Sequence, residues 1–261
     1  MSRSIWAMPA LRIDALAIFQ RNFLVWRKLL GPAIALNFGE PLVYLLGLGL
    51  GLGLLIGEVG GMPYLVFLAS GIVASSAMNT VSFEGMYSVY TRMVPQKTYD
   101  ALMATPLTLD DIVLGEALWA AAKGTISAVA ILLVASLLGV VAGPAAVLAL
   151  PVVFLLGLAM VGPAIVMSAV AGSYDFFSYY FVLVITPMFM LCGVFFPIDT
   201  LPPAIQGLVQ CLPLTHAVEL VRALVTGAIP ERPWLNLLVL AAYAVIGLYL
   251  AVVMVRRRLH D

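Results

Sequence analysis

Long apolar runs, separated by short polar stretches, dominate this sequence. Six runs are long enough to cross a bilayer as helices: residues 32–57, 62–87, 112–141, 144–171, 176–197 and 234–255. Their length distinguishes them from the shorter helices of a soluble core. The pattern predicts an all-α integral membrane protein in which six transmembrane helices form a single domain over residues 1–261.

Residues 10–30 follow a different pattern. Asp14, Arg21 and Lys28 recur every seven residues, with apolar residues between them, and five basic residues occur by position 28. This pattern predicts an amphipathic helix that lies in the headgroup plane of an anionic leaflet. Packing on a soluble core is the alternative, and the apolar run that follows favours the membrane.

Residues 198–232 contain two amphipathic runs that are too short to cross a bilayer as helices. Pro197, Pro202, Pro203 and Pro213 punctuate this region, and proline commonly ends one helix and begins the next. We therefore expect an external cap of two short re-entrant helices.

His216, Glu219 and Arg222 follow at three-residue steps along one face of the second short helix. We interpret them as a charged face that keeps this helix near the interface, with an ion pair at i,i+3 spacing worth about 0.3 kcal/mol. A catalytic group built on His216 and Glu219 is the alternative.

The longest polar stretch runs from residue 90 to 111, and it predicts one or two helical turns between Pro95 and Pro106. Of the thirteen lysines and arginines, five precede the first span, two follow the second and three follow the sixth. Basic residues concentrate on the cytoplasmic side of membrane proteins. Both termini and the 90–106 loop are therefore expected in the cytoplasm, with the cap outside.

Composition supports a membrane protein. The 261 residues are 63% hydrophobic and only 10% charged, with a mean hydropathy of +1.10, whereas a soluble domain carries about a quarter charged residues. Acidic and basic residues cancel, and no nucleic-acid partner is expected. The sequence lacks GxxxxGK[ST], HExxH and GxSxG, so we expect no ATP, metal or catalytic site of its own. Cys192 and Cys211 are expected to be free thiols, with a disulfide as the alternative.

Glycines stand four residues apart in the first apolar run, residues 32–57. Glu40 is the one charged residue of this run. Gly47 and Gly51 form one ridge, and Gly49 and Gly53 form another. Small residues at this spacing let helix backbones approach closely in lipid. The ridges predict close packing on another helix, either across a dimer or within the chain.

Three charged residues lie inside other apolar runs: Glu84, Glu116 and Lys123. An unpartnered charge at mid-bilayer costs roughly 2–3 kcal/mol or more. They could reach the headgroups, pair with one another, line the cytoplasmic mouth of a substrate path, or relay protons.

An aromatic run opens the fifth span and includes Phe177, Tyr180 and Phe181. An interfacial belt is the ordinary interpretation. A stacking surface for sugar rings along a translocation path is the alternative.

Several motifs resemble one family. The arrangement Gly193…Phe196-Pro197…Leu201-Pro202…Pro213-Leu214-x-His216-x5-Arg222 resembles the signature region of type-2 ABC transporter permeases. The stretches 21–28, 83–93 and 100–116 resemble the branch of this family that exports nodulation factors. The resemblance extends over nearly the whole chain.

The resemblance implies a bacterial inner-membrane exporter that contains two copies of this chain and two copies of a NodI-like ABC ATPase, which would hold ATP and Mg. It also implies that the 90–106 loop is a coupling helix docking on the ATPase, through Pro95, Thr98, Tyr99, Leu102, Met103 and Pro106. The implied substrate is an amphiphilic glycolipid or lipo-oligosaccharide, or else a drug or another lipid-like molecule. A proton-coupled secondary transporter and a membrane-embedded enzyme are competing hypotheses.

Overall fold

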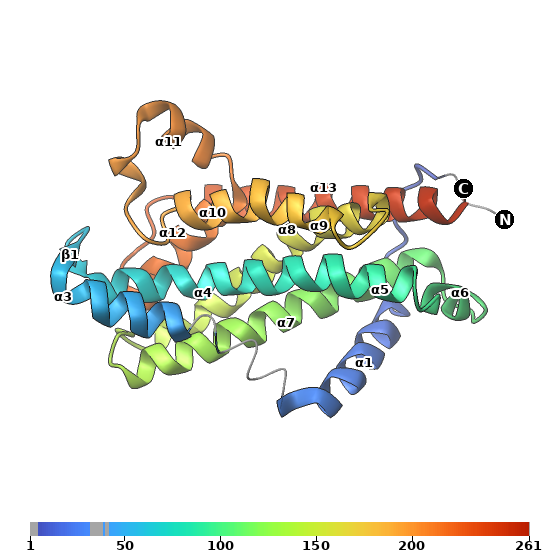
Figure 1. Cartoon of the computed structure of the whole chain (residues 1–261), viewed down its shortest axis with the longest axis horizontal. Helices are drawn as coiled ribbons and strands as arrows, with labels where there is room; N and C mark the ends of the chain where they lie inside the picture. The colour runs from blue at the N-terminus through green and yellow to red at the C-terminus, as the bar shows by residue number, and fades with distance from the viewer. Residues whose placement is uncertain (1–4, 32–38, 40–41, 261) are drawn as a thin grey trace.

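The computed structural model describes residues 5–31, 39 and 42–260, and four long apolar helices form its body (Figure 1). One of them combines α4 (Tyr64–Phe83), η3 (Glu84–Ser88) and α5 (Val89–Met93) into a continuous rod, and we call it the second rod because it occupies the predicted second span. The others are α7 (Leu109–Leu137), η4 and α8 (Pro144–Leu148 and Ala149–Val170), and α13 (Pro233–His260). Each is long and apolar enough to cross a membrane. The chain is therefore an integral membrane protein.

One predicted span is described only in part, and another is shorter than expected. Within residues 32–57 the structure describes η2 (Tyr44–Leu52) and α3 (Gly53–Ile56), whereas residues 32–38 and 40–41, including Glu40, lie outside the described residues. In place of residues 176–197 it has α9 (Phe176–Tyr180), η5 (Phe181–Ile185) and α10 (Thr186–Leu191). This second segment falls below the roughly 20 residues that a perpendicular span needs. Six spans therefore stay a prediction, whereas four long helices are observed.

The predicted cap region contains a sharply bent helix pair. After the short turn η6 (Ile198–Thr200), α11 (Pro203–Val209) and α12 (Pro213–Thr226) meet at 85°. Proline occupies the first position of both helices, where its missing N–H costs no hydrogen bond. A hairpin at the same end of the molecule, β1 (Glu58–Val59) and β2 (Met62–Pro63), was not predicted from the sequence (Figure 1). It turns through Gly60 and Gly61, both with positive φ.

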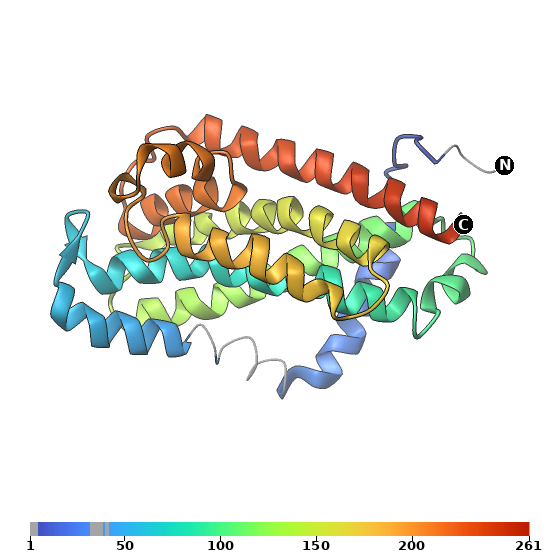
Figure 2. The same ribbon diagram turned by 45° about the horizontal axis from the view of Figure 1, so that its top comes forward.

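The opposite end of the molecule gathers three features. The amphipathic segment appears as α1 (Ala15–Trp26) followed by a turn η1 (Arg27–Leu29), and it packs against α7. The predicted loop helix appears as α6 (Thr98–Met103), beyond the end of α5. Figures 1 and 2 show α6 at the same end as the C-terminal end of α13, away from α11 and α12.

Close backbone approach holds α8 against α13. A Cβ atom at Gly162 of α8 would collide with the backbone of Gly247 of α13, so Gly162 has no room for a side chain, and a Cβ atom at Gly247 would lie 3.1 Å from Pro163 Cδ. Gly157 packs similarly on Ala121 of α7, with its Cβ position 2.9 Å from the Ala121 Cα. Small residues at such crossings gain van der Waals contact, which is the main attraction between helices in lipid.

A buried ion pair joins α13 to the start of α7, and the same arginine contacts the N-terminal segment. The Arg256 guanidinium donates to both carboxylate oxygens of Asp110, at 2.6 Å, and to the carbonyl of Ala7, also at 2.6 Å. Arg258 donates to the last carbonyls of α8, including that of Ala169 at 2.8 Å. Arg256 and Arg258, two of the basic residues from which the cytoplasmic orientation was predicted, therefore also have a structural role.

Candidate functional site

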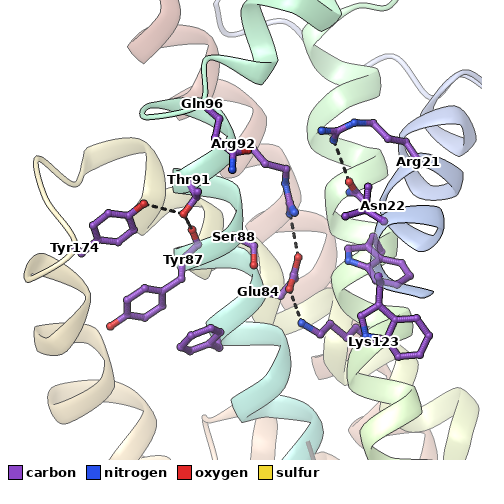
Figure 3. Close-up of a pocket in the computed structure, with 14 residues that line it drawn as sticks. Arg21, Asn22, Glu84, Tyr87, Ser88, Thr91, Arg92, Gln96, Lys123 and Tyr174 are labelled. Atoms are coloured by element: carbon purple, nitrogen blue, oxygen red, sulfur yellow. Dashed lines mark hydrogen bonds and ion pairs between the residues drawn. The ribbon is translucent and has the colours of Figure 1, made fainter. Parts of the chain in front are cut away.

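A cluster of four charged side chains lies between α1, η3, α5 and α7. Glu84 accepts from Lys123 at 2.8 Å and from Arg92 at 3.0 Å, through its two different oxygens. The same Arg92 nitrogen donates to Glu116 at 2.6 Å, and Asn22 of α1 donates to that Glu116 oxygen at 2.9 Å (Figure 3 shows Glu84 and its two partners). The positive charges of Arg92 and Lys123 thus balance the negative charges of Glu84 and Glu116. The structure pairs Glu84 with Lys123, one of the predicted alternatives, whereas Glu116 pairs with Arg92.

Arg92 reaches Glu84 because η3 is a π-helical turn. Residues eight apart in an α-helix point about 80° away from each other, whereas residues seven apart nearly align. A wide turn accommodates one extra residue and restores the alignment across eight positions. Ser168 of α8 supports this turn, because its hydroxyl lies 2.7 and 2.8 Å from the carbonyl oxygens of Gly85 and Met86.

Both carboxylates are buried, with Glu84 3% and Glu116 0% exposed. A buried charge needs a partner, because burial otherwise costs several kcal/mol. Sequence reasoning selected the two glutamates and Lys123 but missed Arg92 and Asn22. The sequence did contain a signal for a missing partner. Two acids, Glu84 and Glu116, lie in apolar runs with only one base, Lys123, so a second base was to be expected close by.

A cavity of about 440 Å³ adjoins the cluster. It lies between α1, the η3–α5 end of the second rod, α7 and the loop before α9 (Figure 3). Charged, hydrogen-bonding and aromatic side chains share its lining, which is formed by Arg21, Asn22, Val25, Trp26, Phe83, Glu84, Tyr87, Ser88, Thr91, Arg92, Gln96, Trp119, Lys123 and Tyr174. This is the volume and mixture of a small-molecule site.

The three aromatic residues predicted for a substrate path pack against other parts of the chain. Phe177 is 0% exposed and meets the rings of Tyr87 and Tyr90 edge-on, at 4.9 and 5.4 Å between centroids. Tyr180 is also buried, and Phe181 is half-buried, 6.3 Å from Tyr87. None of the three lines the cavity. They pack α9 and η5 on the end of the second rod, and their role in a substrate path stays a prediction.

The coupling residues divide into two groups. Pro95, Pro106 and Met103 are exposed, and Thr98 and Leu102 are half-buried, so they form an accessible surface at the end of the molecule. Tyr99 is fully buried and belongs to the core. Its burial, followed by the charge of Glu116, raises the pKa of the phenol well above its usual value of 10. Tyr99 therefore holds α6 against the core beside the charge cluster. Because its side chain is buried, the prediction that Tyr99 lies on the docking face is wrong.

The predicted charged face of α12 is wrong in its geometry. Arg222 points toward α4, where it donates to Ser70 Oγ at 3.0 Å and lies 3.7 Å from the Phe67 ring centroid. It also donates to the carbonyl of Gly193, in the turn after α10, at 2.6 Å. Among the described residues Glu219 forms no ion pair, so the expected bond at i,i+3 spacing is absent. A guanidinium near lipid is stabilised better by buried carbonyls than by an exposed partner.

The remaining cap residues also have structural partners. The His216 ring is buried, with one nitrogen 2.8 Å from Asn236 Oδ1 and the other 2.9 Å from the Gln210 carbonyl. Pro213 is buried and Pro197 half-buried. His216 therefore joins α12 to α13 and to the turn before α12, and no arrangement with Glu219 supports catalysis.

The glycine ridges are used unequally. Gly49 is buried against α4, and a Cβ atom there would lie 2.6 Å from Leu65 Cδ1. Gly53 approaches only Tyr64, at 4.0 Å, and Gly47 and Gly51 have nothing within 4 Å among the described residues. Gly49 thus packs within the chain, and packing of the other ridge across a dimer stays a prediction.

Both cysteines are free thiols, as expected. Cys192 is buried and Cys211 is exposed.

The family model described as "ABC-2 type transporter" matches residues 14–226. Nodulation protein J of Rhizobium meliloti (strain 1021) is 41% identical over 253 residues, covering 97% of both chains. Nodulation protein J of Azorhizobium caulinodans is 30% identical over 245 residues, covering 94% of this chain and 96% of the relative.

These matches include the rods, the bent helix pair and the segment that contains α6. The resemblance expected from the cap motif and the 83–116 stretch is therefore confirmed. The chain belongs to the ABC-2 type transporter family and is a membrane permease homologous to nodulation protein J.

Proposed function

We propose that this chain is the membrane subunit of an ATP-driven exporter in the bacterial inner membrane. The family match over residues 14–226 carries this proposal. In the proposed assembly, two copies of the chain form one transmembrane unit, and residues 1–261 of each copy act as a single domain. Two copies of a NodI-like ABC ATPase bind ATP and Mg.

We propose that α6 and the turns around it dock on the ATPase. Its accessible surface, with Met103 at 39% exposure between Pro95 and Pro106, supports this role. The position of α6 at the same end of the molecule as the C-terminal end of α13 also supports it, because the basic residues at this end favour the cytoplasm (Figure 2). Both termini are then cytoplasmic, and α11 and α12 face outward.

We propose an amphiphilic substrate of the glycolipid or lipo-oligosaccharide type. The homology to nodulation protein J supports this class. A drug or another lipid-like molecule is the alternative substrate.

The test is ATP turnover by the permease reconstituted with its cognate ABC ATPase. Met103→Asp places a charge on the proposed docking surface and is expected to lower co-purification and substrate-stimulated ATP hydrolysis about tenfold or more. Leu208→Asp makes the same change at an exposed position of α11, at the other end of the molecule, and should leave both unchanged. Equal behaviour of the two variants would refute α6 as the docking element.

A proton-coupled secondary transporter is the second candidate, because buried acids and bases meet at Glu84 and Glu116. It predicts transport in vesicles driven by a pH gradient in the absence of ATP and the ATPase. Uptake that needs ATP and does not respond to the gradient would exclude it.

A further inference from the structure

The wall of the cavity contains more hydrogen-bond donors than acceptors. Arg21, Arg92 and Lys123 line it, and Glu84 is the one carboxylate among the lining residues. Both Glu84 oxygens are already engaged, one by Arg92 and one by Lys123. Arg21, Arg92 and Lys123 carry three positive charges. Glu84, together with Glu116 behind Arg92, carries two negative charges, so these five side chains have one excess positive charge.

Arg21 carries this excess. Among the described residues it forms no ion pair, and it donates to the side-chain oxygen of Asn22 at 3.1 Å. Lys123 has three N–H donors, of which one reaches Glu84. The remaining N–H donors of Arg21 and Lys123, around a cavity with an excess positive charge, favour a ligand with anionic oxygen atoms.

The length of the second rod sets the depth of the cavity in a bilayer. The rod has 30 residues and is about 45 Å long, whereas the hydrocarbon core is about 30 Å thick. Arg92 is one residue from the end of this rod, and Glu84 lies about 13 Å from that end. With the rod centred on the bilayer, the cavity would span the boundary between the headgroups and the acyl chains.

The aromatic groups beside the cavity fit this depth. Trp26 of α1 and Trp119 of α7 meet at 5.8 Å between ring centroids, and Phe23 joins them at 6.2 Å. Tryptophan gathers at the membrane interface, where its ring is in contact with lipid and its N–H with polar groups. Leu24 and Val25 are exposed on the same helix, so α1 presents apolar side chains next to the cavity.

From this geometry we propose that the cavity binds the phosphate headgroup of an anionic phospholipid from the leaflet on the α6 side. Arg21 and Lys123 donate to the phosphate oxygens, and the acyl chains lie along the apolar face of α1. The bound lipid thereby joins α1 to α7 and to the end of the second rod. This proposal does not depend on the exported substrate.

The experiment measures binding of phosphatidylglycerol to the delipidated full chain in detergent, by native mass spectrometry, with phosphatidylcholine for comparison. Arg21→Gln should weaken phosphatidylglycerol binding about tenfold or more, because a charge-assisted hydrogen bond is lost. Arg27→Gln is the matched control: it removes the same charge from an exposed position just beyond α1, outside the cavity, and should change binding less than about twofold.

Lys123→Gln is a second variant, in which Glu84 keeps its pair with Arg92 and the fold is expected to persist. It should also weaken phosphatidylglycerol binding. Equal losses in Arg21→Gln and Arg27→Gln, or equal affinity for phosphatidylcholine, would overturn the proposal. Inorganic phosphate should fail to displace the lipid at equal concentration, and full displacement would assign the cavity to a free anion instead.

Discussion

Replacement of Arg92 tests the charge cluster directly. Its one Nη2 nitrogen bridges Glu84 and Glu116, at 3.0 and 2.6 Å. In Arg92→Met, Glu84 keeps Lys123, but Glu116 keeps only the amide of Asn22 as a partner among the described residues. A buried carboxylate without its counter-ion destabilises a protein by about 3–5 kcal/mol.

The expected effect is large enough to measure by thermal unfolding. One kcal/mol shifts Tm by roughly 2–4 °C in a chain of this size, so Arg92→Met should lower Tm by about 6–20 °C. The assay is intrinsic tryptophan fluorescence of the purified protein in detergent during heating. Arg257→Met removes an exposed arginine and should shift Tm by less than about 2 °C.

A double variant separates charge from packing. Glu116→Gln in the Arg92→Met background removes the unpaired charge while keeping the side-chain volume, and it should recover about 1–3 kcal/mol. The reasoning is refuted if the double variant is no more stable than Arg92→Met alone. It is equally refuted if Arg92→Met melts together with Arg257→Met.

The other predictions concern packing and accessibility. Gly162→Ala should destabilise the protein by about 1–3 kcal/mol, because α8 and α13 lack room for a methyl group at this crossing. Gly51→Ala, in open space, should be neutral or slightly stabilising. Melting curves of the two variants check both expectations, and equal shifts in melting temperature would contradict the close crossing. A maleimide should modify Cys211 and leave Cys192 unreacted until the protein unfolds, as intact-mass measurement would reveal, and labelling of both thiols in the folded state would contradict the burial of Cys192. Arg222→Met should leave the Gly193 carbonyl unpaired and lower the unfolding free energy by about 1–3 kcal/mol, and an unchanged melting temperature would count against a stabilising role.

Local signals predicted the elements well. Pro95 and Pro106 framed the position of α6, and the prolines before α11 and α12 marked the bent pair, because proline acts within its own turn. The long apolar runs predicted the four rods, since their length exceeds what a soluble core needs. The family resemblance rested on the same stretches and was confirmed.

Side-chain direction was less predictable. Tyr99 and Arg222 point inward, although each was assigned to an accessible face. A helix face follows from sequence only when every turn has the same number of residues, and the wide turn η3 breaks this regularity before Arg92. Asp110 and Arg256 stand 146 residues apart, so only the packing of α7 and α13 brings them together.

The wide turn η3 also fixes the angular position of everything beyond it. If it tightened into an ordinary α-helix, the segment after Ser88 would swing by about 100° around the rod axis, carrying Arg92 and the attachment of α6 with it. The contacts of Ser168 and the Glu84–Arg92 ion pair both depend on the wide turn and therefore oppose this swing. The direction in which α5 leaves the rod, and with it the position of α6, thus depends on a single turn of the helix.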